Sequence, residues 1–79
     1  MNKDLIEKLS DYEHDRWSRW QNHVFNVSLK NKDGSVTIPK YYVDRWQRQI
    51  NTLYKDLTES EKDSDRKEAI RIVDIINED

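Results

Sequence analysis

The sequence of 79 residues contains no cysteine, one glycine and one proline. Without cysteine, neither a disulfide framework nor a thiolate metal site is possible. Because a secreted domain of this size would usually carry disulfides, we expect a cytoplasmic protein. A single glycine also excludes a glycine-rich phosphate-binding loop.

Long apolar runs and an excess of one charge are missing too. No apolar run approaches the roughly 20 residues that cross a bilayer, so we expect no membrane partner. The 14 basic and 16 acidic residues give a net charge of −2, whereas a nucleic-acid-binding domain normally shows a basic excess or a basic face. A nucleic-acid partner is therefore disfavoured. It would require a basic face built from Arg16, Arg19, Lys40, Arg45 and Arg48.

Large apolar side chains are present and regularly spaced. Three Trp, four Tyr and many Ile, Leu and Val argue against a disordered chain. The length allows one domain, residues 1–79. A three-and-four spacing predicts a first helix that runs to about residue 28, with an apolar stripe formed by Ile6, Leu9, Trp17, Trp20, Val24 and Val27. Tyr12 lies beside this stripe.

Two further helices are predicted. Pro39 suits the first turn of the second helix, whose stripe is Val43, Trp46, Ile50 and Leu53, with Leu57 near its end. Thr58 and Glu61 fit a capping box at the start of the third helix, which runs to about residue 77. Its predicted buried face consists of Ala69, Ile72, Val73, Ile75 and Ile76, widened by Ile70.

The segment between the first two helices is ambiguous. Asp33-Gly34 is a turn signal. We expect a loop with a short extended piece at residues 35–38, and the alternative is a β-hairpin over residues 25–38, in which Phe25, Val27 and Leu29 alternate. The predicted fold class is mainly all-α, a compact three-helix bundle with a loop or short extended segment around residues 29–38.

Two stretches resemble the ryanodine-receptor (RyR) domain family. EHDRW (13–17) is similar to a His-x-Arg-Trp signature in that family's first helix, and LYKDLTESEKDSDR (53–66) is similar to its later part. The matching residues are His14, Arg16, Trp17, Tyr54, Leu57, Glu61, Lys62, Asp65 and Arg66. The Gly-Trp and Gly turn of the channel repeats are missing, and Thr52-Leu53 stands before Tyr54 where Pro is common. The likeness is closer to the stand-alone versions of bacteria and phages.

The resemblance implies a cytoplasmic interaction domain without catalytic activity and without a cofactor. Its partner would be another protein or, as an alternative, a nucleotide-derived signalling molecule. The ligand-binding hypothesis places a pocket at the middle of the first helix, where Arg16 and Arg66 hold an anion and an aromatic ring stacks on Trp17 or Trp20. The candidate residues are His14, Arg16, Trp17, Trp20, Tyr54, Asp65 and Arg66.

Structural roles compete with this hypothesis. Arg16, Asp65 and Arg66 could form ion pairs between the first and third helices. Trp17, Trp20 and Trp46 fit core positions, and we expect the Tyr54 hydroxyl to bond a backbone group. The acidic run Glu59, Glu61, Asp63 and Asp65 lacks the Gly and the closing Glu of a calcium loop, and it suits a helix start.

No catalytic site is expected. His14 and His23 are nine residues apart, and the serines show no nucleophile-elbow context. A thin-cored chain gains burial by pairing, so a homodimer is physically reasonable.

Overall fold

The computed structural model describes residues 3–78. It confirms the mainly all-α class with three helices and adds a small hairpin and one 3-10 turn. In chain order the elements are α1 (Lys3–Val27), β1 (Leu29–Lys30), β2 (Val36–Thr37), α2 (Lys40–Ile50), η1 (Tyr54–Asp56) and α3 (Glu59–Glu78).

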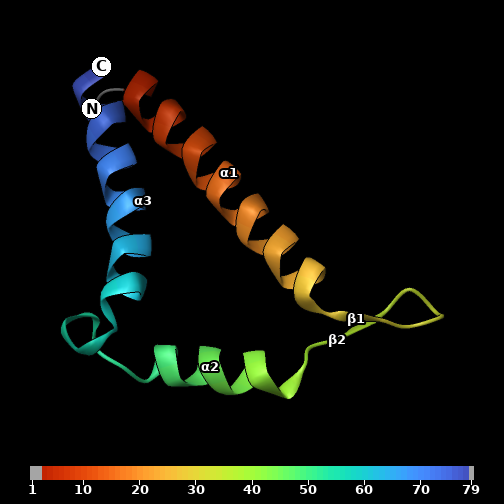
Figure 1. Cartoon of the computed structure of the whole chain (residues 1–79). Coiled ribbons are helices and arrows are strands. Elements are labelled where there is room, and N and C mark those ends of the chain that lie inside the picture. Colours follow the sequence, from red (N-terminus) through yellow and green to blue (C-terminus); the bar gives the residue numbers. More distant parts are fainter. Residues whose placement is uncertain (1–2, 79) are drawn as a thin grey trace.

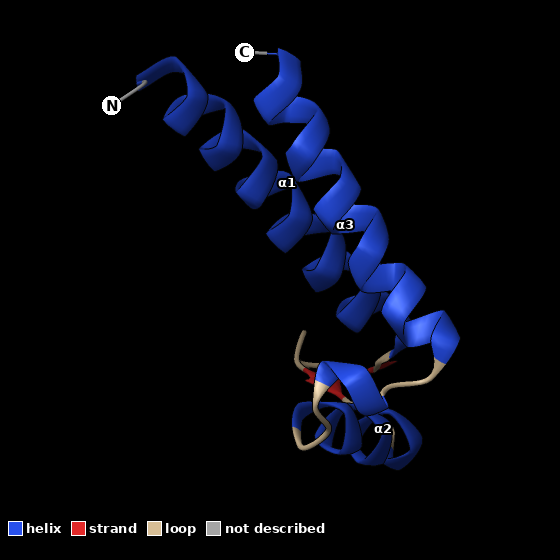
Figure 2. Cartoon of the chain, turned by 90° about the vertical axis from the view of Figure 1, so that its left-hand side faces the viewer, coloured by secondary structure: helices blue, strands red, loops and turns tan. Residues whose placement is uncertain are grey.

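The three helices form the sides of a triangle (Figure 1). The start of α1 and the end of α3 lie close together, the two helices diverge from there, and α2 runs across the open end. In the perpendicular view, α1 and α3 run side by side and α2 lies beyond one end of the pair (Figure 2). The helices therefore do not surround one common axis.

This arrangement is more open than the compact bundle that we expected. The radius of gyration is 16.1 Å, against about 12 Å for a compact domain of this length. The physical reason is the length of α2. At 1.5 Å per residue, its 11 residues span about 16 Å, whereas the 25 residues of α1 span about 37 Å. Because α2 bridges the gap between α1 and α3, it does not cover them lengthwise.

The segment between α1 and α2 is a minimal hairpin. Leu29 pairs with Thr37 and Lys30 pairs with Val36 in an antiparallel register. Gly34 sits in the turn with a positive φ of 91°, a conformation that favours glycine. The extended piece predicted at residues 35–38 is confirmed at Val36–Thr37, and the hairpin alternative is correct only for these short strands. Phe25 and Val27 stay in α1.

Helix α2 begins after Pro39, as predicted, but ends before Leu53. Pro39 O accepts hydrogen bonds from the backbone N–H groups of Tyr42 and Val43. At the other end, the side chains of Asn51 and Thr52 donate to backbone carbonyls one turn earlier, at 2.9 and 2.6 Å. These side-chain bonds compete with continued helix. Leu53 and Leu57 therefore lie in the connection around η1.

Helix α3 begins with the predicted capping box. The Thr58 N–H donates to Glu61 Oε1 at 3.1 Å, and the Glu61 N–H donates to Thr58 Oγ1 at 3.2 Å. Two N–H groups that have no partner inside the helix are thereby satisfied.

The core is very small. Among the described apolar residues only Tyr12 and Ile75 are buried, with 8% and 5% of their surface exposed. Within residues 3–78, thirteen large hydrophobic residues are at least 39% exposed: Ile6, Trp17, Trp20, Phe25, Leu29, Ile38, Tyr41, Ile50, Leu53, Tyr54, Ile70, Val73 and Ile76.

The predicted core is therefore wrong at several positions. Trp17, Trp20, Val73 and Ile76 are exposed, as is Ala69, while Ile72 and Trp46 are half-buried. The reason is that α3 docks on Tyr12, which lies beside the apolar stripe of α1 rather than on it.

Candidate functional site

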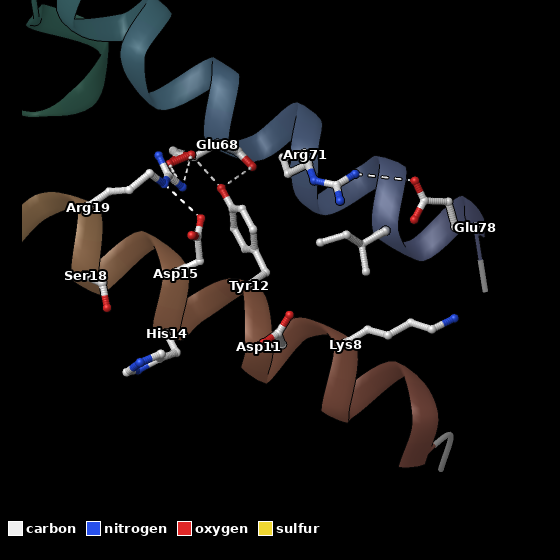
Figure 3. Close-up of a pocket in the computed structure, with 11 residues that line it drawn as sticks. Lys8, Asp11, Tyr12, His14, Asp15, Ser18, Arg19, Glu68, Arg71 and Glu78 are labelled. Atoms are coloured by element: carbon white, nitrogen blue, oxygen red, sulfur yellow. Dashed lines mark hydrogen bonds and ion pairs between the residues drawn. The ribbon is translucent and has the colours of Figure 1, made fainter.

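The contact between α1 and α3 is centred on Tyr12, Arg19 and Glu68 (Figure 3). The Tyr12 hydroxyl donates to Glu68 Oε2 at 2.5 Å, and Arg19 Nη2 lies 2.8 Å from Glu68 Oε1. Arg19 Nε also donates to Asp15 Oδ2 at 2.9 Å. This network joins the middle of α1 to the middle of α3. Ile75 is buried about two turns beyond Glu68 along α3.

The network fixes the protonation of its members. The Tyr12 hydroxyl bond, supported by Arg19, lowers the pKa of Glu68. Burial, together with the bond to Glu68, raises the pKa of Tyr12. Glu68 is therefore held ionised and Tyr12 neutral at physiological pH.

A polar groove runs along one side of the α1–α3 pair. Its charged groups have both signs, which makes it a poor match for a ligand of one charge. Among the predicted site residues, His14 lines this groove, and Figure 3 shows its ring pointing away from α3. The groove is lined by Lys8, Asp11, Tyr12, His14, Asp15, Ser18, Arg19, Glu68, Arg71, Ile75 and Glu78.

The other predicted site residues do not form one pocket. Arg16 Nη2 binds Glu13 Oε1 at 2.5 Å, within α1. Arg66 Nη1 binds Asp63 at 2.7 Å and Glu59 at 3.1 Å, within α3. These carboxylates raise the pKa of both arginines. Each guanidinium group is thus paired mainly on its own helix, although Glu68 of α3 also raises the pKa of Arg16 and Tyr54 also raises that of Arg66. The two arginines form neither the shared anion site nor the ion-pair network with Asp65 that we predicted.

The remaining candidates fall into two separate groups, one on α1 and one around η1 and the start of α3, where Tyr54 interacts with Arg66. The His14 ring stacks on Trp17 with the ring centres 6.2 Å apart. Lys62 Nζ lies 5.9 Å from the centre of the Tyr54 ring, which is 48% exposed, and Asp65 is exposed on α3.

Trp20 belongs to an aromatic corner between α1 and α2. Its ring centre lies 5.3 Å from that of Trp46 and 5.4 Å from that of His23. Tyr42 continues the cluster at 5.5 Å from Trp46. Such tilted and edge-on pairs contribute roughly 0.5–1.5 kcal/mol each beyond their buried area, so the corner holds α2 to the end of α1.

An ion pair connects α2 to α3. Arg48 Nη2 forms an ion pair with Glu61 Oε2, and Glu61 is only 7% exposed. The Arg48 bond, with the Thr58 N–H, lowers the pKa of Glu61 to about 2. Three members of the acidic run at the start of α3, Glu59, Glu61 and Asp63, are thereby paired with arginines. Within residues 3–78, no group of three or more His, Asp or Glu side chains is placed to hold a metal ion.

The side of the α1–α3 pair away from the groove is apolar. Each residue of a helix is rotated by about 100° from the residue before it. By this count, the stripe of α1 lies between one sixth and just under one half of a turn around the helix from Tyr12. The stripe of α3 lies at a similar angle from Ile75, in the same rotational sense. Because the two helices are antiparallel, equal rotations turn both stripes to the same side of the pair. We call this side the apolar face; it consists of Ile6, Leu9, Trp17 and Trp20 of α1 and Ile72, Val73 and Ile76 of α3.

The positions of the groove residues support this placement. Asp11, Asp15 and Ser18 of α1, and Arg71 and Glu78 of α3, lie on the opposite side of Tyr12 and Ile75 by the same count and line the groove together. On the apolar face, Trp17 is 59% exposed and Val73 is 52% exposed. The pair is therefore two-sided, and one of its sides exposes large apolar side chains of both helices.

Comparisons with protein-family models, with curated proteins and with solved structures found no match. Within residues 3–78, every helix is too short or too polar to cross a membrane.

Proposed function

We propose that this chain is a non-enzymatic protein-interaction domain that buries its apolar face against another polypeptide. The observation that carries the proposal is the exposure of that face: Ile6, Trp17, Trp20, Val73 and Ile76 are each at least 42% exposed. Exposed large apolar side chains gathered on one side of a molecule mark an interaction site in soluble proteins.

The balance of burial supports the same conclusion. Fully burying a large apolar side chain contributes about 1.5–3 kcal/mol, and only two such side chains in the described chain are buried. Small domains with so little core are usually stabilised by disulfides, metals or association. With no cysteine in the sequence, association is the means that the observed surface favours.

The resemblance to RyR domains implies the same class, an interaction domain without catalysis. The alternative of a nucleotide-derived ligand has less support, because Arg16 and Arg66 bind carboxylates of their own helices and lie on separate elements.

Dye binding tests the proposal. At a concentration where sedimentation shows single chains, 8-anilinonaphthalene-1-sulfonate should fluoresce strongly with the wild type. The double substitution Val73→Gln, Ile76→Gln should reduce this signal while the helical circular dichroism is kept. Glutamine is preferred to lysine because a positive charge would attract the anionic dye.

The matched control is Ile70→Gln. Ile70 is 60% exposed on the same helix, but its position lies outside the apolar face. The control should therefore keep most of the wild-type signal. A helical wild-type chain that leaves the dye dark would contradict the proposed function.

A further inference from the structure

We propose that the polypeptide that covers the apolar face is a second copy of this chain, so that two α1–α3 pairs pack face to face as a four-helix bundle. This inference rests on the proposed function and names its partner. Each copy would contribute an antiparallel helix pair, and α2 would lie outside the bundle at one end of each pair.

The exposed area is large enough for such a dimer. The accessible surface of the chain is 6578 Å², whereas a compact monomer of 9.6 kDa exposes about 5,100 Å². The excess is about 1,500 Å². A stable interface of standard size buries about 800 Å² per partner. The excess over the whole chain is therefore larger than the area that one such interface buries on each partner.

The charge on the face suits contact with itself. A two-fold axis brings the same patch of both copies together, so an uncompensated charge there would meet its own like charge. By the same count, the described part of the face carries no charged side chain of α3 at the Ile72, Val73 and Ile76 end, whereas Asp65 and Lys62 of α3 lie on it at the Trp17 and Trp20 end. Glu13, which interrupts the α1 stripe, is paired with Arg16 at 2.5 Å. The mixed charges around Glu68 lie in the groove on the opposite side.

The geometry of the helix pair suits the same architecture. Helices α1 and α3 are 25 and 20 residues long, run antiparallel and present their apolar stripes to one side. Two such pairs, packed across those stripes, reproduce the arrangement of a four-helix bundle with its apolar positions inside. The aromatic corner occupies the face at the Trp20 end, so the contact falls towards the other end of the pair, on Ile6, Leu9, Ile72, Val73 and Ile76.

Light scattering after size exclusion, combined with small-angle X-ray scattering of the full chain, tests this inference. The wild type should have twice the monomer mass of 9.6 kDa. The double substitution Val73→Asp, Ile76→Asp places like charges of both copies against each other and should give a monomer. Ile70→Asp, which adds a charge to the same helix outside the face, should remain a dimer.

A milder double substitution keeps the test usable if the aspartate variant unfolds. If the aspartate variant loses its helical signal, Val73→Gln, Ile76→Gln should still raise the dimer dissociation constant by about tenfold or more relative to Ile70→Gln. A dimer that persists with unchanged affinity in the face variants would overturn this interface.

Two monomeric outcomes separate the inference from the proposed function. A wild-type monomer with a radius of gyration near 16.1 Å would overturn the second copy as partner and leave the face open for a different protein. A wild-type monomer near about 12 Å would overturn both, because the chain would then cover its own apolar face.

Discussion

The two ends of α3 differ in what holds them. At the N-terminal end, Thr58 and Glu61 bond each other reciprocally and Arg48 pairs with Glu61. In the C-terminal half, Ile75 is 5% exposed while Val73 and Ile76, on the neighbouring stripe, are about half exposed. The polar groups at the N-terminal end find their partners within the chain. The C-terminal half presents more apolar surface than the one neighbouring helix covers.

The largest expected effect comes from Ile75, where the C-terminal half does contact α1. Ile75→Ala should lower the free energy of unfolding by about 2 kcal/mol or more, because it removes one of the few buried apolar side chains. Urea denaturation followed by helical circular dichroism measures the loss. Protein concentration is held fixed, because association with a partner shifts apparent stability.

Ile70→Ala is the matched control for this prediction. Ile70 is 60% exposed on the same helix, so its truncation should change stability by about 0.5 kcal/mol or less. Equal losses from the two substitutions would show that α3 does not dock on α1 through Ile75.

The next effect concerns the N-terminal end. Thr58→Ala removes the hydroxyl that accepts the Glu61 N–H, and it should cost about 1 kcal/mol of stability. Thr58→Ser keeps that hydroxyl and should cost much less. Urea denaturation of the two variants tests this difference. An alanine variant as stable as the serine variant would count against the capping box.

The last effect is the loss of wild-type stability in acid. The folded-state pKa of Glu61 is lowered to about 2 by Arg48 and by the Thr58 N–H. A carboxylate with a lowered pKa contributes stability that is present above its unfolded pKa, near 4.5, and is lost as the pH falls towards 2. Wild-type stability should therefore decline between these values.

Urea midpoints measured across this pH range test the expectation. Glu61→Gln should be less stable at neutral pH and decline less steeply in acid. Some decline should remain in that variant, because Tyr12 and Arg19 also lower the pKa of Glu68. Glu7→Gln, at an exposed position in α1, should keep the wild-type slope; an identical slope for Glu61→Gln would contradict the Arg48 pairing.

The sequence predicts those parts of the fold that depend on neighbours in the chain. The end of α1, the role of Pro39 and the capping box of Thr58 and Glu61 follow from local spacing and hydrogen bonding. The early end of α2 was missed because Asn51 and Thr52 bond back onto the helix, and such bonds are not visible in an apolar stripe. The rotation of α3 on α1 was missed because it depends on a contact between residues 56 positions apart.

The site was less predictable than the fold. Arg16 and Arg66 were expected to meet, but closer carboxylates on their own helices, Glu13 and Asp63, engage them first. The residues that do join the helices are Tyr12, Arg19 and Glu68. A signal for them exists in hindsight: Tyr12, Asp15 and Arg19 repeat at three and four positions along one face of α1, as Glu68, Ile72 and Ile75 do on α3.

The attachment of α2 has a kinetic consequence. This helix is held by the aromatic corner at its middle and by the Arg48–Glu61 pair near its end. Neither α1 nor α3 packs along its whole length. Its amide hydrogens should therefore exchange with solvent through a local opening that leaves α1 and α3 paired. The slowest amides should lie around Tyr12 and Ile75, and α2 should be the first part of the fold to be released as temperature rises.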